Sequence, residues 1–300
     1  MLQAQESEIP SATIAHARRL PAACGDAGIL IRWLIPVAGL ALSTWLLFAY
    51  LSTFPDFWFD EGYKANAART LAELGRYATR SIDGLIPYDP GISGGPAETV
   101  AMAFGFKLFG VTVAAARAPA ALFGLLALVA LYGVVVTLHG PRAATLACLV
   151  VLAAPPLQGV SFVLLGRQAL AEVPALALLL CGLYVYVRVA PSPPSSYRRM
   201  AGLLAAGVFL GLAMLSRQQW ALTFGPAVLL LAALRVEWRA RGWPRRALTE
   251  LLPIMLMVAT VAAWKTTEYL NSPDDCERRT RRWHSTRCGR TFSRTCGAAG

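Results

Sequence analysis

The sequence predicts an all-α integral membrane protein with about seven transmembrane helices. Hydrophobic residues make up 56% of its 300 residues and charged residues only 15%, whereas an ordinary soluble domain has about half and a quarter. The charges are clustered, and long uncharged apolar runs lie between the clusters. A helix that rises 1.5 Å per residue needs about 20 apolar residues to cross a bilayer. Runs of this length cover residues 33–51, 118–138 and 143–165.

Four shorter apolar runs follow, at residues 173–187, 201–215, 220–234 and 251–264. Each can cross a bilayer if the arginines at its ends snorkel to the head groups and the bilayer thins locally. In the alternative arrangement, residues 201–234 form a re-entrant pair around Arg217, and the chain then has five spans.

The distribution of arginine predicts the orientation in the membrane. The net charge of +11 comes largely from arginines in loops beside the apolar runs, such as 188–200 and 235–250. Cytoplasmic loops carry such an excess, so these loops are predicted to lie inside, and the charge does not indicate nucleic-acid binding. The polar arm, residues 1–32, is then cytoplasmic and the loop 52–117 is outside. The first apolar run exceeds the core of a signal peptide and is predicted to be a retained helix.

The transmembrane module is predicted to cover residues 33–270, with the composition changing abruptly beyond it. Residues 271–300 form a basic, cysteine-containing tail. Two interpretations stay open for this tail: a disordered basic segment, or the translation of a shifted reading frame.

The outer loop is predicted to contain two short helices on the membrane surface. Apolar residues at helical spacing run from 62 to 74 and stop at Gly75, a residue typical of helix C-termini. A second apolar helix is predicted at 100–109, closed by Gly110. Between them, residues 81–96 are rich in glycine and proline, which is typical of an ordered turn segment.

Two adjacent carboxylates, Asp60 and Glu61, follow the first span within the segment Phe57-Trp58-Phe59-Asp60-Glu61-Gly62-Tyr63. The aromatic residues are of the kind that gathers at the membrane interface. A carboxylate placed here could act as general base on a hydroxyl acceptor. The alternative is that Asp60 caps the surface helix by accepting backbone N–H bonds.

The short loop 166–172 carries Arg167 and Glu172 on the same side of the membrane as Asp60. A guanidinium binds phosphate oxygens in bidentate fashion, so Arg167 is a candidate for holding a lipid phosphate. Arg217 and Lys64 are further candidates for the same role. The alternative is an anchor, with Arg167 reaching head groups and Glu172 placed favourably at a helix N-terminus.

Histidine and cysteine show no spacing typical of a metal site or a disulfide framework. The sequence has no glycine-rich phosphate loop, which argues against a nucleotide-dependent enzyme or an ATPase.

Several segments, in their order along the chain, resemble membrane glycosyltransferases of the GT-C fold. They are Phe59-Asp60-Glu61-Gly62, the stretch from Tyr88 to Pro96, Phe106-Lys107-Leu108-Phe109-Gly110, and Arg117. Ala153-Ala154-Pro155 followed by Arg167 and Glu172 resembles the second outer loop of that family. The likeness covers residues 33–235 and is greatest to the bacterial RgtA-like branch, related to protein mannosyltransferases and the aminoarabinose transferase of lipid A.

The resemblance implies a polyprenyl-phosphate-linked sugar as donor and a lipid, glycan or protein hydroxyl as acceptor. Transfer occurs with inversion at the outer face of the cytoplasmic membrane of a bacterium. Asp60 would be the base, supported by Glu61 and by Glu172 from the second loop. Arg167, Arg217 and Lys64 would contact the donor phosphate. No cofactor is required, although a divalent cation near Asp60 is compatible with this chemistry.

Family members run on through further spans, so the chain looks like a C-terminally truncated copy that the missing part could leave inactive. Two other functions stay open. A secondary transporter would carry internal repeats and ionisable residues near mid-span, whereas the ionisable residues here gather in outer loops. A non-catalytic membrane partner is the third interpretation.

Overall fold

The computed structural model describes residues 26–82, 84–87, 95–155, 161–193, 196–217, 219 and 243–270. The chain divides into two units, residues 1–41 and 42–300. The described part of the first unit is the opening portion of helix α1 (Asp26–Phe48). The end of α1 and all other elements belong to the second unit.

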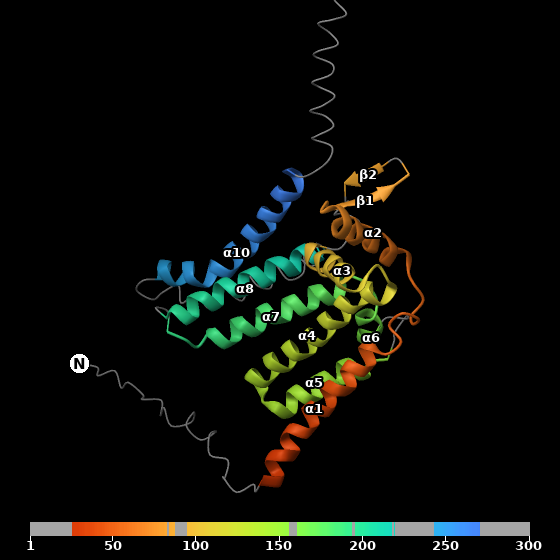
Figure 1. The fold of residues 1–300 in the computed structure, drawn as a ribbon. Coiled ribbons are helices and arrows are strands. Elements are labelled where there is room, and N and C mark those ends of the chain that lie inside the picture. The colour runs from red at the N-terminus through yellow and green to blue at the C-terminus, as the bar shows by residue number, and fades with distance from the viewer. Residues whose placement is uncertain are drawn as a thin grey trace, which may run out of the picture. The chain divides into compact units, whose positions relative to one another are not determined.

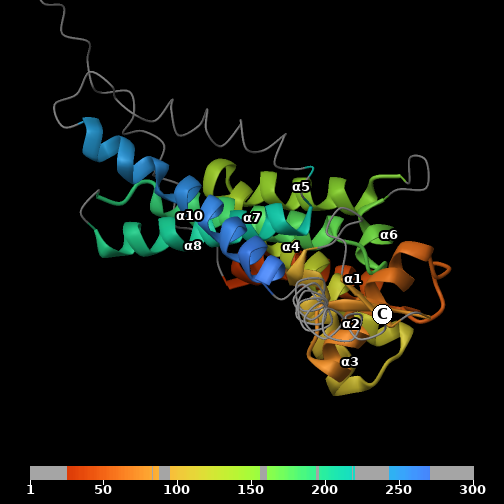
Figure 2. The same ribbon diagram turned by 90° about the horizontal axis from the view of Figure 1, so that it is seen from above.

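Helices of the second unit lie side by side in a row, in which α10 packs on α8, α8 on α7, α7 on α4 and α4 on α5 (Figures 1 and 2). Their bounds are α4 Val113–His139, α5 Pro141–Ala153, α7 Glu172–Val189, α8 Tyr197–Ser216 and α10 Trp243–Leu270.

Glycines bring neighbouring helices of the row into close contact. A Cβ atom added at Gly207 of α8 would lie 2.7 Å from the carbonyl oxygen of Pro253 in α10. One added at Gly182 of α7 would lie 3.2 Å from the carbonyl oxygen of Ala206 in α8. Small residues allow this backbone approach in membrane bundles, where association depends on van der Waals packing.

Three of the predicted spans are confirmed as helices long and apolar enough to cross a membrane. Within the described residues these helices are α4, α7 and α8. α7 and α8 are longer than the apolar runs that predicted them, because each extends into flanking charged residues. α8 is long enough to cross a membrane by itself, so its sequence need not form half of a re-entrant pair. The predicted run 220–234 lies outside the described residues, and the count of seven spans stays a prediction.

The predicted single span over 143–165 is wrong. Helix α5 ends at Ala153, and a new short helix, α6 (Phe162–Gly166), begins seven residues after Pro155. Ala154 has ψ 121°, because a residue that precedes proline is pushed out of the helical region. Hydrophobicity alone did not reveal this break, since the residues on both sides of it are apolar.

The segment between α1 and α4 forms a small layer that covers one end of the helices in the row (Figure 1). It consists of α2 (Phe59–Leu74), an antiparallel hairpin of β1 (Ala78–Ser81) and β2 (Gly84–Pro87), and α3 (Pro96–Phe109). Both short helices were predicted, and both begin earlier than the apolar residues suggested. The stops are confirmed: Gly75 is left-handed with φ 67° and Gly110 has φ 77°. The hairpin was not predicted.

Alanine-rich packing fixes this layer to the row. A buried cluster joins α2, α3, the start of α4 and the turn after α6, through Ala68, Met102, Ala103, Phe106, Ala115, Ala116 and Ala169. The N–H of Gly95, just before α3, donates to the carbonyl of Ser216 at the end of α8 (3.3 Å). The outer layer is therefore held at both α4 and α8.

Candidate active site

Arg117 of α4 anchors the turn that connects α1 to α2. The side chain is fully buried, and each of its five N–H donors has an acceptor. Nε and Nη2 donate to the two carboxylate oxygens of Glu61, at 2.8 and 2.9 Å. The others donate to the carbonyls of Leu51 (3.2 Å), Pro55 (2.8 Å) and Asp56 (3.2 Å). One guanidinium thus fixes the whole connection.

Glu61 joins the segment between α1 and α4 to the turn between α6 and α7. Besides Arg117, its carboxylate accepts from the N–H of Ala169 in the second loop (3.0 Å) and from the N–H of Trp58 (3.2 Å). The last of these bonds is one half of a capping box at the start of α2. Glu61 is fully buried, so it does not reach a substrate directly. It can act by positioning its neighbour Asp60.

Asp60 lies beside Glu61 in the first turn of α2, and its side chain is exposed. The interpretation of Asp60 as the N-cap is wrong. The cap position belongs to Trp58, whose backbone is extended at φ −91° and ψ 151°, and Asp60 comes two residues later. Among the described residues its carboxylate has no ion pair or hydrogen bond, which leaves it available to an incoming group.

Two ion pairs lie where α2, α3, α7 and the end of α8 meet. Glu172, at the start of α7, contacts Arg217 at 2.6 Å, with both side chains 28% exposed. Lys64 and Glu98 are buried and 3.5 Å apart. Burial raises the pKa of Glu98, and Glu172 and Glu61 raise it further, while Lys64 opposes the shift. Of the three sequence-predicted cations, Arg217 is therefore the most accessible.

Arg167 binds the end of α1. One Nη of its buried guanidinium donates to the carbonyl of Ala49, and the group lies 5.1 Å from the ring centre of Phe54. Neither Arg167 nor Glu172 is joined to Asp60 by a hydrogen bond or ion pair in the part of the chain that the structure describes. That the three act together on one substrate stays a prediction.

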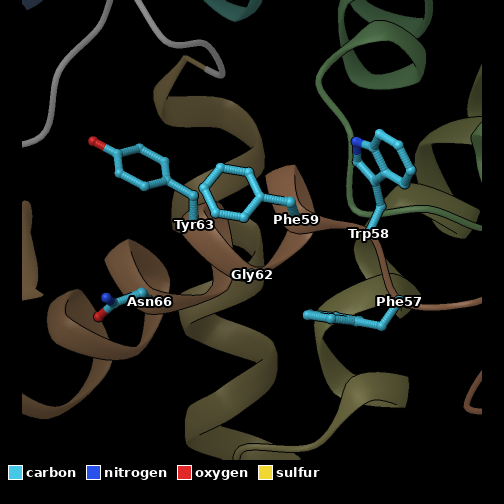
Figure 3. Close-up of a pocket in the computed structure, with 6 residues that line it drawn as sticks. All are labelled: Phe57, Trp58, Phe59, Gly62, Tyr63 and Asn66. Atoms are coloured by element: carbon cyan, nitrogen blue, oxygen red, sulfur yellow. The ribbon is translucent and has the colours of Figure 1, made fainter.

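A pocket of about 350 Å³ opens next to Asp60. It is lined by Phe57, Trp58, Phe59, Gly62, Tyr63 and Asn66, whose side chains Figure 3 shows around the first turns of α2. Among the described residues, no three histidine, cysteine, aspartate or glutamate side chains gather where they could hold a metal ion.

Sequence reasoning missed the roles of Arg117 and Glu98. Arg117 lies in the second turn of α4, a long apolar helix. A lone charge beside a span is costly unless paired, which is the signal that could have singled it out. Its partner is 56 positions away in the sequence, and no local pattern identifies that.

Residues 93–264 match the family of dolichyl-phosphate-mannose-protein mannosyltransferases. The chain belongs to this family. The match covers α3 and the row of helices as far as residue 264 in α10, and it argues against the transporter interpretation. No curated protein sequence matches the chain.

Solved structures of membrane glycosyltransferases share the fold. ArnT from Cupriavidus metallidurans, in its apo state, has a TM-score of 0.62 and 22% identity over 82% of this chain and 43% of its own. The Pmt1–Pmt2 complex of S. cerevisiae gives 0.63 and 17%, over 80% and 34%. AglB from Archaeoglobus fulgidus gives 0.56 and 18%, over 78% and 29%. The expected GT-C fold is confirmed, and the chain spans less than half the length of these proteins.

The buried ion pair of Arg117 and Glu61 predicts that a single substitution, Glu61→Gln, lowers the stability of the protein strongly. Glu61→Gln removes the charge that compensates Arg117 and turns an N–H₂ group toward its donors. Breaking a buried ion pair costs about 3–5 kcal/mol, so the variant should unfold at a much lower temperature. Thermal unfolding of the purified protein in detergent measures this.

The matched control is Glu73→Gln, on the same helix. Glu73 pairs with Arg69 and Arg80 at the surface, where ion pairs contribute little. This variant should unfold close to the wild-type temperature. Equal behaviour of the two variants would contradict the anchoring role of Glu61.

Proposed function

We propose that the protein transfers a sugar from a polyprenyl-phosphate donor to a hydroxyl acceptor at the outer face of the membrane. One observation carries the proposal: an exposed carboxylate, Asp60, is held on a rigid turn by the saturated pair of Glu61 and Arg117. Two proteins of the same fold support a lipid-linked donor, since ArnT has been seen with undecaprenyl phosphate and Pmt1–Pmt2 with the sugar donor.

In the proposed reaction, Asp60 accepts the proton of the acceptor hydroxyl. The hydroxyl oxygen attacks the anomeric carbon of the donor sugar, and the bond from that carbon to the phosphate oxygen breaks. The polyprenyl phosphate leaves with the electron pair, and the configuration at the anomeric carbon inverts. A carboxylate close to the acceptor supplies general-base catalysis, and the phosphate is already a good leaving group.

Arg217 is proposed to receive the donor phosphate. Its guanidinium is partly exposed and, among the described residues, pairs with Glu172, whereas Arg167 is buried and donates to a carbonyl, and Lys64 is buried against a glutamate. A guanidinium neutralises the phosphate as negative charge develops on it. Glu172 would orient Arg217 before the donor arrives. No cofactor is needed for this step.

Replacing Asp60 tests the base. Asp60→Asn keeps the shape of the side chain, and because Asp60 is not the cap, α2 should form as before. Transfer should fall by roughly 100-fold or more, the usual range for losing a general base. Membranes containing the protein, incubated with radiolabelled polyprenyl-phosphate sugars with and without a chelator, measure it.

In that assay, wild-type membranes that transfer no sugar from any donor would refute the proposed function. An active Asp60→Asn protein would refute the role of Asp60 alone, and a loss of wild-type transfer on chelation would show that a cation is needed.

A second pair of variants separates the candidate phosphate ligands. Arg217→Lys keeps the charge but loses the bidentate fork. Hydrogen bonds to charged groups are worth about 1.5–3 kcal/mol, so the donor KM should rise roughly 10-fold or more. Arg167→Lys should leave the donor KM unchanged and lower the unfolding temperature, since Arg167 holds the end of α1. The opposite pattern would assign the phosphate to Arg167.

We further propose a bacterial cytoplasmic membrane as the location, with the N-terminal arm and the loops 188–200 and 235–250 inside and residues 52–117 outside. The arginine excess of those loops supports this orientation. A single cysteine at position 82, where Ile82 is fully exposed beyond β1, should react with an impermeant maleimide in intact cells.

A single cysteine at Arg142, exposed at the start of α5, is the matched probe for the inner face. It should react only after the cells are permeabilised. The reverse labelling would invert the topology.

A further inference from the structure

We infer that the aromatic pocket beside Asp60 is the subsite for a pyranose ring of a glycan acceptor. The pocket as a sugar-binding site stands on its own geometry, while the word acceptor rests on the proposed function.

The floor of the pocket is one face of α2. Phe59, Gly62, Tyr63 and Asn66 follow the i, i+3, i+4, i+7 pattern of a single helical face. Phe57 and Trp58 come from the segment before the helix and form the opposite side of the pocket (Figure 3). A Cβ atom at Gly62 would lie 3.4 Å from Cε1 of Phe57, so glycine keeps the floor open beneath that ring.

The rings of the pocket are largely exposed. Phe59 is 81% exposed, Trp58 61% and Phe57 48%. Large exposed apolar surface that is gathered in one place commonly marks a binding site, and in this case the surface is concave.

The pocket is nevertheless rigid, because the backbone beneath it is held from inside. Arg117 binds the carbonyls of Pro55 and Asp56 and lies 5.7 Å from the ring centre of Phe57. Glu61 accepts from the N–H of Trp58. The amide of Asn66 donates to the carbonyl of Arg80 (3.0 Å) and accepts from its N–H (3.2 Å). A site organised in this way loses little freedom when a ligand binds.

The lining selects for a sugar ring over the other groups present at this surface. A pyranose presents C–H bonds on its faces, which are attracted to the negative face of an aromatic ring, and hydroxyls on its edge, which suit the Asn66 amide. The six lining residues include no aliphatic side chain for a polyprenyl or acyl chain, and no cation for a phosphate. An aromatic membrane belt needs no such concavity.

The pocket also lies where an acceptor must be. Asp60 follows Phe59 in the first turn of α2, about 100° around the helix axis. A ring stacked on Phe59 lies one helix position from Asp60. One of its hydroxyls can then meet the carboxylate, which supplies the positioning that a general base requires.

The test is glycan binding without donor. The purified full chain in lipid nanodiscs is applied to a printed array of bacterial and eukaryotic glycans, with a peptide array in parallel. The double variant Trp58→Leu, Phe59→Leu keeps apolar side chains but removes two π faces. Its glycan binding should fall at least 10-fold, at an unchanged unfolding temperature. The control is Phe104→Leu on α3, a residue 63% exposed and outside the pocket, which should bind as the wild type does.

Three results would overturn the inference: no glycan retained by the wild type, equal binding by the leucine variant, or retention of peptides in place of glycans. The proposed function fails separately. If glycans bind and the leucine variant loses them, but wild-type membranes transfer no sugar, the subsite stands and the transferase does not. If transfer occurs, the leucine variant should raise the acceptor KM and leave kcat nearly unchanged, whereas Asp60→Asn should bind glycans normally and lower kcat.

Discussion

Arg117 lies in the second turn of α4 and is fully buried, so its charge and its five N–H groups require partners from the protein. Glu61 supplies the charge, and three carbonyls of the α1–α2 connection supply the rest. Removing either member leaves an uncompensated buried ion. The connection has no helix or strand of its own between Phe48 and Phe59, and it is this pair that gives it one conformation. The start of α2 and the aromatic rings beside Asp60 depend on that conformation.

A largely buried ion pair also lies at the opposite end of α8, where α8 meets α10. Glu250 of α10 contacts Arg199 of α8 and accepts from the hydroxyl of Tyr186 in α7 at 3.2 Å, while Arg199 also donates to the carbonyl of Ser192 at 3.0 Å. Between the two ends, contacts are apolar and pass through small residues such as Gly182 and Gly207. Apolar faces of this kind can slide past one another, since they carry no directional bonds. The ion pairs set the register of the helices at the ends, and the glycines allow close packing between them.

Much of this arrangement could be predicted from the sequence, for reasons that are local. Apolar length found α4, α7 and α8, helical spacing found α2, and Gly75 marked its end. The break between α5 and α6 was missed because apolar residues on both sides concealed the effect of Pro155. The hairpin was missed because its strands are four residues each, too short for alternation to show. The pairing of Arg117 with Glu61 depends on two segments meeting in space, and sequence composition contains no information on that.

Three carboxylates of the layer formed by α2 and α3, those of Glu61, Glu98 and Asp60, differ in burial and in hydrogen-bond partners, and these differences suit them to different roles. Glu61 is buried and fully bonded, which suits a structural role. Glu98 is buried beside a single lysine, and burial raises its pKa. Among the described residues, neither oxygen of Glu98 has a hydrogen-bond partner within ordinary geometry. Asp60 is in contact with solvent and has a turn of helix behind it. Its carboxylate is open to an incoming group, and because Glu61 fixes the backbone one residue away, its position varies little. A general base needs both properties, and in this layer the sequence Asp-Glu provides them from adjacent residues: one takes the solvent side of the helix and the other the buried side.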